Sequence, residues 1–224
     1  MPSAAMSSGR ADGHPCMDTS ETAPLPDLTP AARAVANLLD AIGDDRLGAP
    51  TPCPDYSVRE LLAHIDGLSL AFRDAARKDF GPTTGNDPGS ALPVLDEKWR
   101  TVLPRRLDEL AQAWRQPSAW DGMTQAGGVD LPGQIAGRVA LNELVLHGWD
   151  LARATGQEYD PGEASAAVSY EMVKPSGDDS LRDGIFGPPV AVPDDAPLLD
   201  RAVGMSVGVL TGGQVTDGGG GAGR

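Results

Sequence analysis

Two side chains that can bind a metal ion occur four residues apart in an otherwise apolar stretch of the sequence. Glu143 and His147 lie within residues 135–151, IAGRVALNELVLHGWDL. A helical period places both on one face, about one turn apart. An isolated carboxylate in an apolar interior costs several kcal/mol unless it is neutralised or paired. A cation between Glu143 and His147 would remove that cost, and the alternative is a surface ion pair worth a few tenths of a kcal/mol.

A third candidate ligand is His64, which shares a helical face with Leu61 and Leu68. The chain has three histidines, and the remaining one, His14, falls in a segment that we expect to be disordered. Two imidazoles and one carboxylate form the three-ligand set of a catalytic zinc site, which leaves the fourth position for water or a substrate atom. Such an ion lowers the pKa of a bound water or thiol. The alternative interpretation of His64 is a histidine that simply packs in the core.

Two acidic residues are placed to orient these candidate ligands. Asp150 follows His147 by three residues, and Glu60 precedes His64 by four. A carboxylate that accepts a hydrogen bond from a ligating imidazole fixes the orientation of its ring. Both acids are equally compatible with solvated pairs on a helix surface.

Four further residues are weaker candidates. Arg153 and Arg138 could meet an anionic substrate or support the site, although helix-surface ion pairs explain them as well. Cys53 lies in a Thr-Pro-Cys-Pro segment, and a small buried loop residue is favoured over a ligand there. The sequence offers Cys53 no dedicated base, so a cysteine nucleophile is not favoured. We expect Trp149 in the core.

The elements that must position these residues are helical. Thr29 is placed to cap a first helix with Pro30 at its first position, and Ser57 and Glu60 form a capping box that begins a second helix, residues 57–78. The fourth helix, residues 133–155, ends at Gly156. The apolar residues of the first two helices recur at helical spacing, namely Val35, Leu38, Leu39 and Ile42, then Val58, Leu61, Leu62, Ile65, Leu68 and Phe72.

The rest of the ordered region carries shorter signals. A third helix is predicted over Leu95–Trp114, and Pro104 should kink or divide it. Gly127 and Gly128 favour a short hairpin around Met123–Leu131. A fifth helix begins at Asp160, which is placed as its cap, and a last short helix runs from Leu198 to about Val207. We therefore predict an all-α fold, a four-helix bundle with one or two additional short helices, over residues 28–211.

Composition narrows the function classes. The net charge is −14, so a general nucleic-acid or anionic-membrane surface is not expected. The two cysteines cannot build a disulfide framework or a multi-cysteine zinc site. No apolar run is long enough for a membrane span, and no secretory signal is found, so we expect a cytoplasmic protein. Residues 1–27 and the glycine-rich residues 212–224 are predicted to be disordered tails.

Two longer motifs resemble one family. Residues 51–64, TPCPDYSVRELLAH, are similar to the "TPCPxWxVRDLLxHL" segment of the mycothiol-dependent maleylpyruvate isomerase group, within the wider DinB/YfiT-like superfamily. Residues 142–156, NELVLHGWDLARATG, resemble its "ELxVHGWDLARATG" segment. Residues 192–201 are similar to the closing segment of a small single-domain actinobacterial subfamily of metal-binding proteins.

The resemblance implies a DinB-like four-helix bundle with a divalent metal, commonly zinc, at one end. Its metal ligands correspond to His64, Glu143 and His147. Characterised members pass a low-molecular-weight thiol such as mycothiol to an electrophile, or use it to isomerise a cis double bond. The partners implied are therefore a small-molecule thiol as cosubstrate and an electrophilic small molecule.

The resemblance covers the bundle and not the α+β domain that follows it in the full-length isomerases. It therefore implies a thiol S-transferase at least as readily as isomerisation of maleylpyruvate. Two alternatives remain: a metal- or small-ligand-binding bundle without turnover, and a metal-free reaction in which Glu143 and His147 serve as acid and base. A monomer and a homodimer are both compatible with the sequence.

Overall fold

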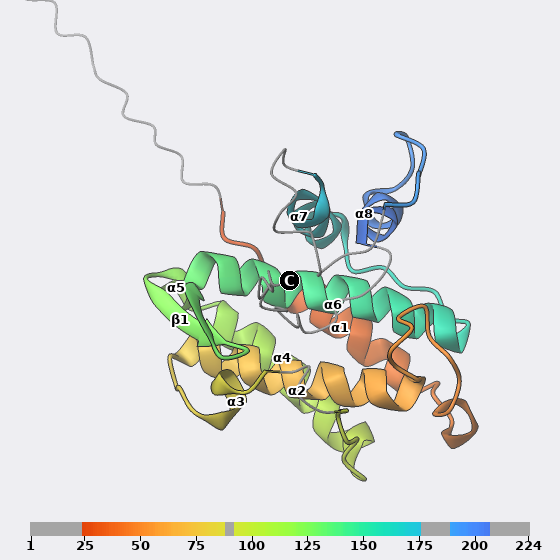
Figure 1. Ribbon diagram of the computed structural model, residues 1–224, viewed down its shortest axis with the longest axis horizontal. Helices are drawn as coiled ribbons and strands as arrows, with labels where there is room; N and C mark the ends of the chain where they lie inside the picture. Colours follow the sequence, from red (N-terminus) through yellow and green to blue (C-terminus); the bar gives the residue numbers. More distant parts are fainter. Residues whose placement is uncertain (1–23, 88–91, 176–188, 207–224) are drawn as a thin grey trace, which may run out of the picture.

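The computed structural model describes residues 24–87, 92–175 and 189–206 (Figure 1). Most of the tail predicted to be disordered at residues 1–27 lies outside the described residues. The whole of the tail predicted at residues 212–224 also lies outside them. The same holds for the predicted end of the last helix at Val207.

Four helices form a bundle, in agreement with the predicted all-α class. They are α1 (Thr29–Leu39), α2 (Val58–Arg77), α4 (Trp99–Trp114) and α6 (Gly133–Thr155). Helices α1 and α2 each pack against both α4 and α6, so the four helices surround one core (Figure 1). The consequence for function is that α2 and α6, which carry the three candidate ligands, are direct neighbours.

Shorter elements flank the bundle (Figure 1). Helices α7 and α8 pack on each other and on α6, and α3 and α5 lie with the hairpin beside α2. The four-residue helices α3 and α5 were not predicted, because one turn is too short to show a helical period. The flanking elements are η1 (Asp44–Arg46), α3 (Pro82–Gly85), α5 (Pro117–Trp120), β1 (Met123–Ala126), β2 (Val129–Pro132), α7 (Glu163–Val173) and α8 (Leu198–Ser206).

Three local predictions are confirmed. The backbone N–H of Ser57 donates to Glu60 Oε2 at 2.7 Å, which is half of the predicted capping box. Helix α6 ends at Gly156, whose φ of 70° favours glycine. Strands β1 and β2 form the predicted antiparallel hairpin, closed by Gly127 and Gly128 at φ 60° and 77°.

The predicted caps of two other helices were wrong. Thr29 lies inside α1, and the carboxylate of Asp27 accepts from the Thr29 N–H at 2.9 Å and from its hydroxyl at 2.6 Å. Helix α7 begins at Glu163 after Gly162, and Asp160 accepts from the Gly162 N–H at 2.8 Å. In both cases the carboxylate accepts a hydrogen bond from the backbone N–H two residues later in the chain, which forms a local turn ahead of the helix.

Helix α4 also differs from its prediction. It begins at Trp99, after Leu95, because Asp96 Oδ1 accepts from the backbone N–H of Lys98 at 2.7 Å and forms a turn there. Pro104 does not divide the helix. It lies in the second turn, where only its bond to the carbonyl of residue 100 is lost and the rest of α4 stays intact.

A close approach of α6 to two tryptophans fixes the position of this helix in the bundle. The Trp114 and Trp120 rings meet edge to face, with centroids 5.0 Å apart. Their indole N–H groups donate to the carbonyls of Phe72 and Trp114, at 3.0 and 2.7 Å. A Cβ at Gly137 of α6 would approach both rings to 2.6–2.7 Å. Only glycine therefore lets α6 pack at this distance.

We expect Gly137→Ala to lower the free energy of unfolding by about 1–3 kcal/mol, because the added methyl overpacks the tryptophan pair. Gly67→Ala is the matched control. Gly67 also lies within a helix, but a Cβ there meets nothing within 4 Å, so alanine should raise stability by up to about 1 kcal/mol. Urea denaturation followed by circular dichroism measures both, and equal effects of the two substitutions would contradict the packing argument.

Candidate metal centre

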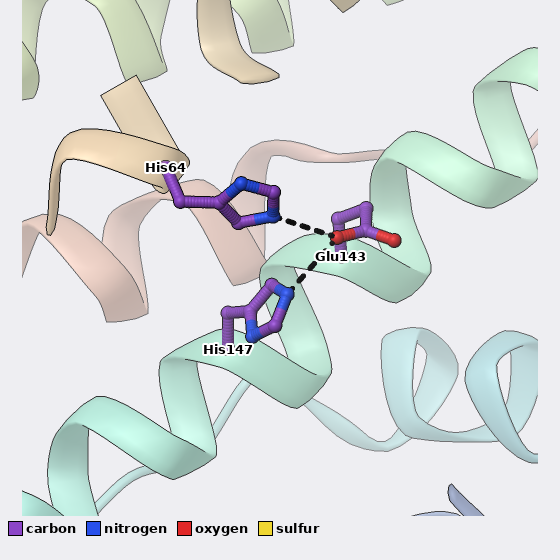
Figure 2. Close-up of side chains that lie close together, drawn as sticks. All are labelled: His64, Glu143 and His147. Atoms are coloured by element: carbon purple, nitrogen blue, oxygen red, sulfur yellow. Dashed lines mark ion pairs between the residues drawn. The ribbon is translucent and has the colours of Figure 1, made fainter. Parts of the chain in front are cut away.

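The packing of α2 on α6 brings His64, Glu143 and His147 together (Figure 2). Glu143 Oε2 lies 3.8 Å from His64 Nε2 and 3.2 Å from His147 Nε2. One ligand atom of each residue lies within 4.8 Å of those of the other two. The two imidazole rings are nearly perpendicular, with centroids 5.0 Å apart. All three side chains therefore converge on one point from two separate helices.

The three side chains are buried, with exposed fractions of 7% for His64, 9% for Glu143 and 2% for His147. The Nε2 atoms of both histidines are inaccessible and have no hydrogen-bond partner of acceptable geometry among the described residues. Buried polar atoms are almost always satisfied, so two such atoms aimed at one carboxylate call for a ligand.

Glu143 and His147 shift each other's pKa values in opposite directions. Burial alone would raise the pKa of Glu143, but the adjacent imidazoles of His147 and His64 outweigh it and lower this pKa to about 2. Burial alone would lower the pKa of His147, but the carboxylates of Asp150 and Glu143 outweigh it and raise this pKa to about 9. Without a metal, the site thus favours a positive charge between Glu143 and His147. A divalent ion supplies that charge directly.

The spacing fits a small divalent ion. Zinc holds nitrogen and oxygen ligands at about 2.0–2.2 Å, so neighbouring ligand atoms in a tetrahedron lie about 3.3–3.5 Å apart. The distances of 3.2 and 3.8 Å from Glu143 Oε2 bracket that value. Three protein ligands leave one coordination position for an exogenous group, as in catalytic zinc sites.

Asp150 contacts one of the three residues. Its Oδ2 atom lies 3.2 Å from His147 Nδ1. If Nδ1 carries the proton, it donates a hydrogen bond to the Asp150 carboxylate. The lone pair of His147 is then on Nε2, the atom that faces Glu143. Of the two acids expected to orient a histidine, Asp150 is therefore in position, whereas Glu60 is engaged with Ser57 in the capping box.

The other predicted residues lie apart from this cluster. Arg138 is exposed, and Arg153 is exposed beside the Trp149 ring and donates to the Gln157 carbonyl at 3.2 Å. Trp149 is half-buried and packs against a small cluster near α8, not in the main core. Cys53 is buried, and burial followed by the charges of Asp150, Asp55 and Glu143 raises the pKa of its thiol to about 11. This supports the expectation that Cys53 is not a nucleophile.

Two features of the site were not anticipated from the sequence. The ring of Tyr56 lies 5.0 Å from the ring of His64. A cavity of about 510 Å³ adjoins the cluster, and His64 and Glu143 form part of its wall. The small residues Ala63, Gly67 and Ala71 recur at four-residue spacing along α2 and line this cavity, and their spacing is the signal that could have indicated it.

Comparison with known proteins identifies the family. The profile of the mycothiol maleylpyruvate isomerase N-terminal domain matches residues 28–152, which include all three residues of the cluster. The chain belongs to this family. The match spans α1 through most of α6, and this part of the bundle contains the observed cluster.

Two further comparisons give individual relatives and a structural neighbour. Two uncharacterized proteins, MT0763 and Rv0738, from two strains of Mycobacterium tuberculosis, are each 28% identical over 130 residues, covering 58% of this chain and 66% of theirs. The chain thus spans slightly less than two thirds of these relatives. A crystal structure of a histidine-to-alanine mutant of the mycothiol-dependent maleylpyruvate isomerase superposes with a TM-score of 0.52 at 16% identity, covering 66% of this chain and 70% of that one. This superposition establishes a shared fold.

None of the helices in the part of the chain that the structure describes has the length and apolar character that crossing a bilayer requires.

If the cluster binds a metal, His147→Ala and Glu143→Gln should each weaken zinc binding by more than about 100-fold, because each removes a ligand from a three-ligand set. Glu158→Gln changes an exposed carboxylate of the same type and should leave the affinity unchanged. Competition titration against a chromophoric chelator measures the affinity, and circular dichroism checks folding. Zinc bound equally tightly by a folded His147→Ala protein would exclude this site.

Asp150→Ala should lower zinc affinity by about 10- to 100-fold without changing the stoichiometry, because the His147 ring loses the partner that holds it in place. Arg153→Ala is the matched control, since Arg153 lies on the same helix and stacks on Trp149. The same chelator competition measures both variants. Equal losses of affinity in the two would show that Asp150 has no specific part in orienting His147.

Proposed function

We propose that this protein uses a divalent metal ion, with zinc the best fit, held by His64, Glu143 and His147, to activate a low-molecular-weight thiol. Mycothiol is the thiol that the family points to. The activated thiol is then transferred to an electrophile or used for cis–trans isomerisation. The observation that carries the proposal is the pair of buried Nε2 atoms that face Glu143 beside the cavity and have no hydrogen-bond partner among the described residues.

The bound metal would supply Lewis acidity that keeps a thiol deprotonated at neutral pH, the form that attacks electrophiles. Glu143 neutralises one of the two charges of such an ion, so one positive charge remains for one thiolate. Asp150 holds the His147 ring in the orientation that binding requires. The cavity gives a second molecule access to the site while apolar walls exclude most water.

Both reactions begin with addition of the thiolate to a carbon–carbon double bond. In S-transfer to an activated alkene, the thiolate sulfur forms a bond to one alkene carbon, and the proton released by the thiol ends on the adjacent carbon. In isomerisation, the same sulfur–carbon bond forms, the former double bond rotates, and the thiolate leaves as the trans alkene forms. His64 and Glu143 face the cavity where these bonds would change.

A binding protein without turnover is the second candidate. One observation favours it: His64 and Glu143, both already assigned to the metal, are the ionisable residues in the described cavity wall. No separate acid or base is therefore provided there. The metal-free acid–base alternative has less support, because pKa values of about 2 for Glu143 and about 9 for His147 place neither group near neutrality.

Cobalt-substituted protein tests thiol activation directly. Adding mycothiol should produce a sulfur-to-cobalt charge-transfer band, because the sulfur binds at the open position. The band should be absent with S-methylated mycothiol and in the His147→Ala protein. The variant Cys53→Ser should retain it, which shows that the sulfur is not that of the buried cysteine.

Turnover separates the two candidates. An enzyme should consume mycothiol in the presence of an activated alkene faster than the metal-stripped protein does, with adducts or trans product detected by mass spectrometry. A charge-transfer band without thiol consumption would support the binding protein. Absence of the band in fully cobalt-loaded protein would overturn the proposal of thiol activation.

A further inference from the structure

The wall of the cavity beside the three-ligand cluster is mostly apolar. Its wall comes from α2, α3 and the residues after it, the β1–β2 hairpin and α6. Apart from His64 and Glu143, the wall is formed by aliphatic, aromatic, glycine and proline residues together with Thr83 and Asn86. The hydroxyl of Thr83 is itself used, because it donates to Asp74 Oδ2 at 2.8 Å. The wall therefore offers a ligand mostly apolar surface.

No lysine or arginine lines the described wall of this cavity. Three basic side chains lie near the end of α2. Arg73 pairs with Asp74 and Glu109 at 2.7–2.8 Å, and Lys78 donates to the Ala119 carbonyl at 3.2 Å. Arg77, the last residue of the helix, is exposed and is not part of the cavity wall. The described residues between α2 and α4 that line the cavity are uncharged, namely Pro82, Thr83, Asn86 and Pro93. The described residues of the wall therefore supply no cationic side chain to an anion.

The room for a ligand comes from α2. Gly67 occupies the middle of this 20-residue helix, where glycine costs helix stability relative to alanine. A Cβ at Gly67 would meet nothing within 4 Å, so no packing contact requires glycine there. With Ala63 and Ala71 one turn to either side, Gly67 leaves the cavity open next to His64, whose buried Nε2 has no hydrogen-bond partner.

The opposite wall is held in place by polar contacts. The backbone N–H of Gly128 in the hairpin donates to the Thr84 carbonyl at 2.9 Å, and the Thr84 hydroxyl contacts Gln125 Oε1 at 3.1 Å. A Cβ at Gly128 would lie 3.0 Å from the Gly85 carbonyl, so the hairpin and α3 are in close contact. The cavity is thus a preformed feature of packed elements.

We infer that this cavity binds the electrophilic partner of the thiol and selects an uncharged, apolar molecule over a carboxylate. The inference rests on the proposed function for the reaction, but the selectivity follows from the wall alone. Maleylpyruvate, the substrate named for the structural neighbour, carries two carboxylates. In this cavity such groups would lose water and gain no cationic partner from the wall, because Glu143 and one thiolate together balance the two charges of the proposed ion.

Displacement of an uncharged fluorescent dye tests this selectivity without turnover. N-phenyl-1-naphthylamine should bind metal-stripped protein with one site per chain. Diethyl maleate and maleate share one cis double bond and differ in charge. The diester should displace the dye at a concentration at least about tenfold lower than maleate does, because it is transferred into the cavity without an uncompensated charge.

Variants at two cavity positions assign the binding site. Gly67→Phe should fill the open space and weaken dye binding at least about tenfold, whereas Gly67→Ala, the matched control, should retain it. Ala71→Arg should introduce the missing cation and lower the maleate concentration needed for displacement. Circular dichroism checks that each variant is folded.

The outcomes separate this inference from the proposed function. Equal displacement by maleate and the diester, or dye binding unchanged in Gly67→Phe, overturns the inference. Failure of the chain to bind metal, with the dye selectivity intact, overturns the proposed function and leaves the apolar selectivity standing. Thiol adducts formed with maleate in preference to the diester overturn the inference and support thiol activation.

Discussion

The arrangement of the site depends on one electrostatic constraint, a carboxylate held in the apolar interior of a helical bundle. Glu143 is 9% exposed, and the groups that compensate its charge come from two helices, His147 from α6 and His64 from α2. A one-residue rotation of α2 would carry His64 away from Glu143, and a rotation of α6 would carry Glu143 and His147 together away from His64. Either change would remove part of the compensation of a buried charge, which is costly. The register of α2 on α6 is therefore both a stability requirement and the condition for metal binding.

Contacts remote from the cluster maintain that register. Gly137 lets α6 approach the Trp114–Trp120 pair, and the buried hydroxyl of Tyr159 donates to the Leu144 carbonyl at 2.8 Å on the far side of the helix. A Cβ at Gly148 would lie 2.3 Å from that hydroxyl, so Tyr159 packs directly against the turn that carries His147. These contacts fix α6 along its length.

The sequence predicted the bundle and the Glu143–His147 pair because both depend on local patterns, whereas His64 was joined to the pair by its inward helical face and by the family resemblance. Helical periods identify α1, α2 and α6, and an acid and a histidine four residues apart share a face wherever a helix forms. Thr29 and Leu95 were misplaced because Asp27 and Asp96 compete for nearby backbone N–H groups and shift the helix starts. The small residues of α2 could have indicated one wall of the cavity, but its full shape could not be predicted, since it exists only where α2, α3, the hairpin and α6 meet.

The three-ligand cluster and part of the cavity wall belong to different kinds of element. The cluster lies on two long helices of the bundle, whose fold the chain shares with the maleylpyruvate isomerase at 16% identity. Part of the cavity wall comes from α3 and the β1–β2 hairpin, short elements within the same profile match whose side chains can change without disturbing the core. One bundle fold can therefore carry cavity walls of different charge, and the charge of the wall limits which ligands a cavity accepts more than the fold does.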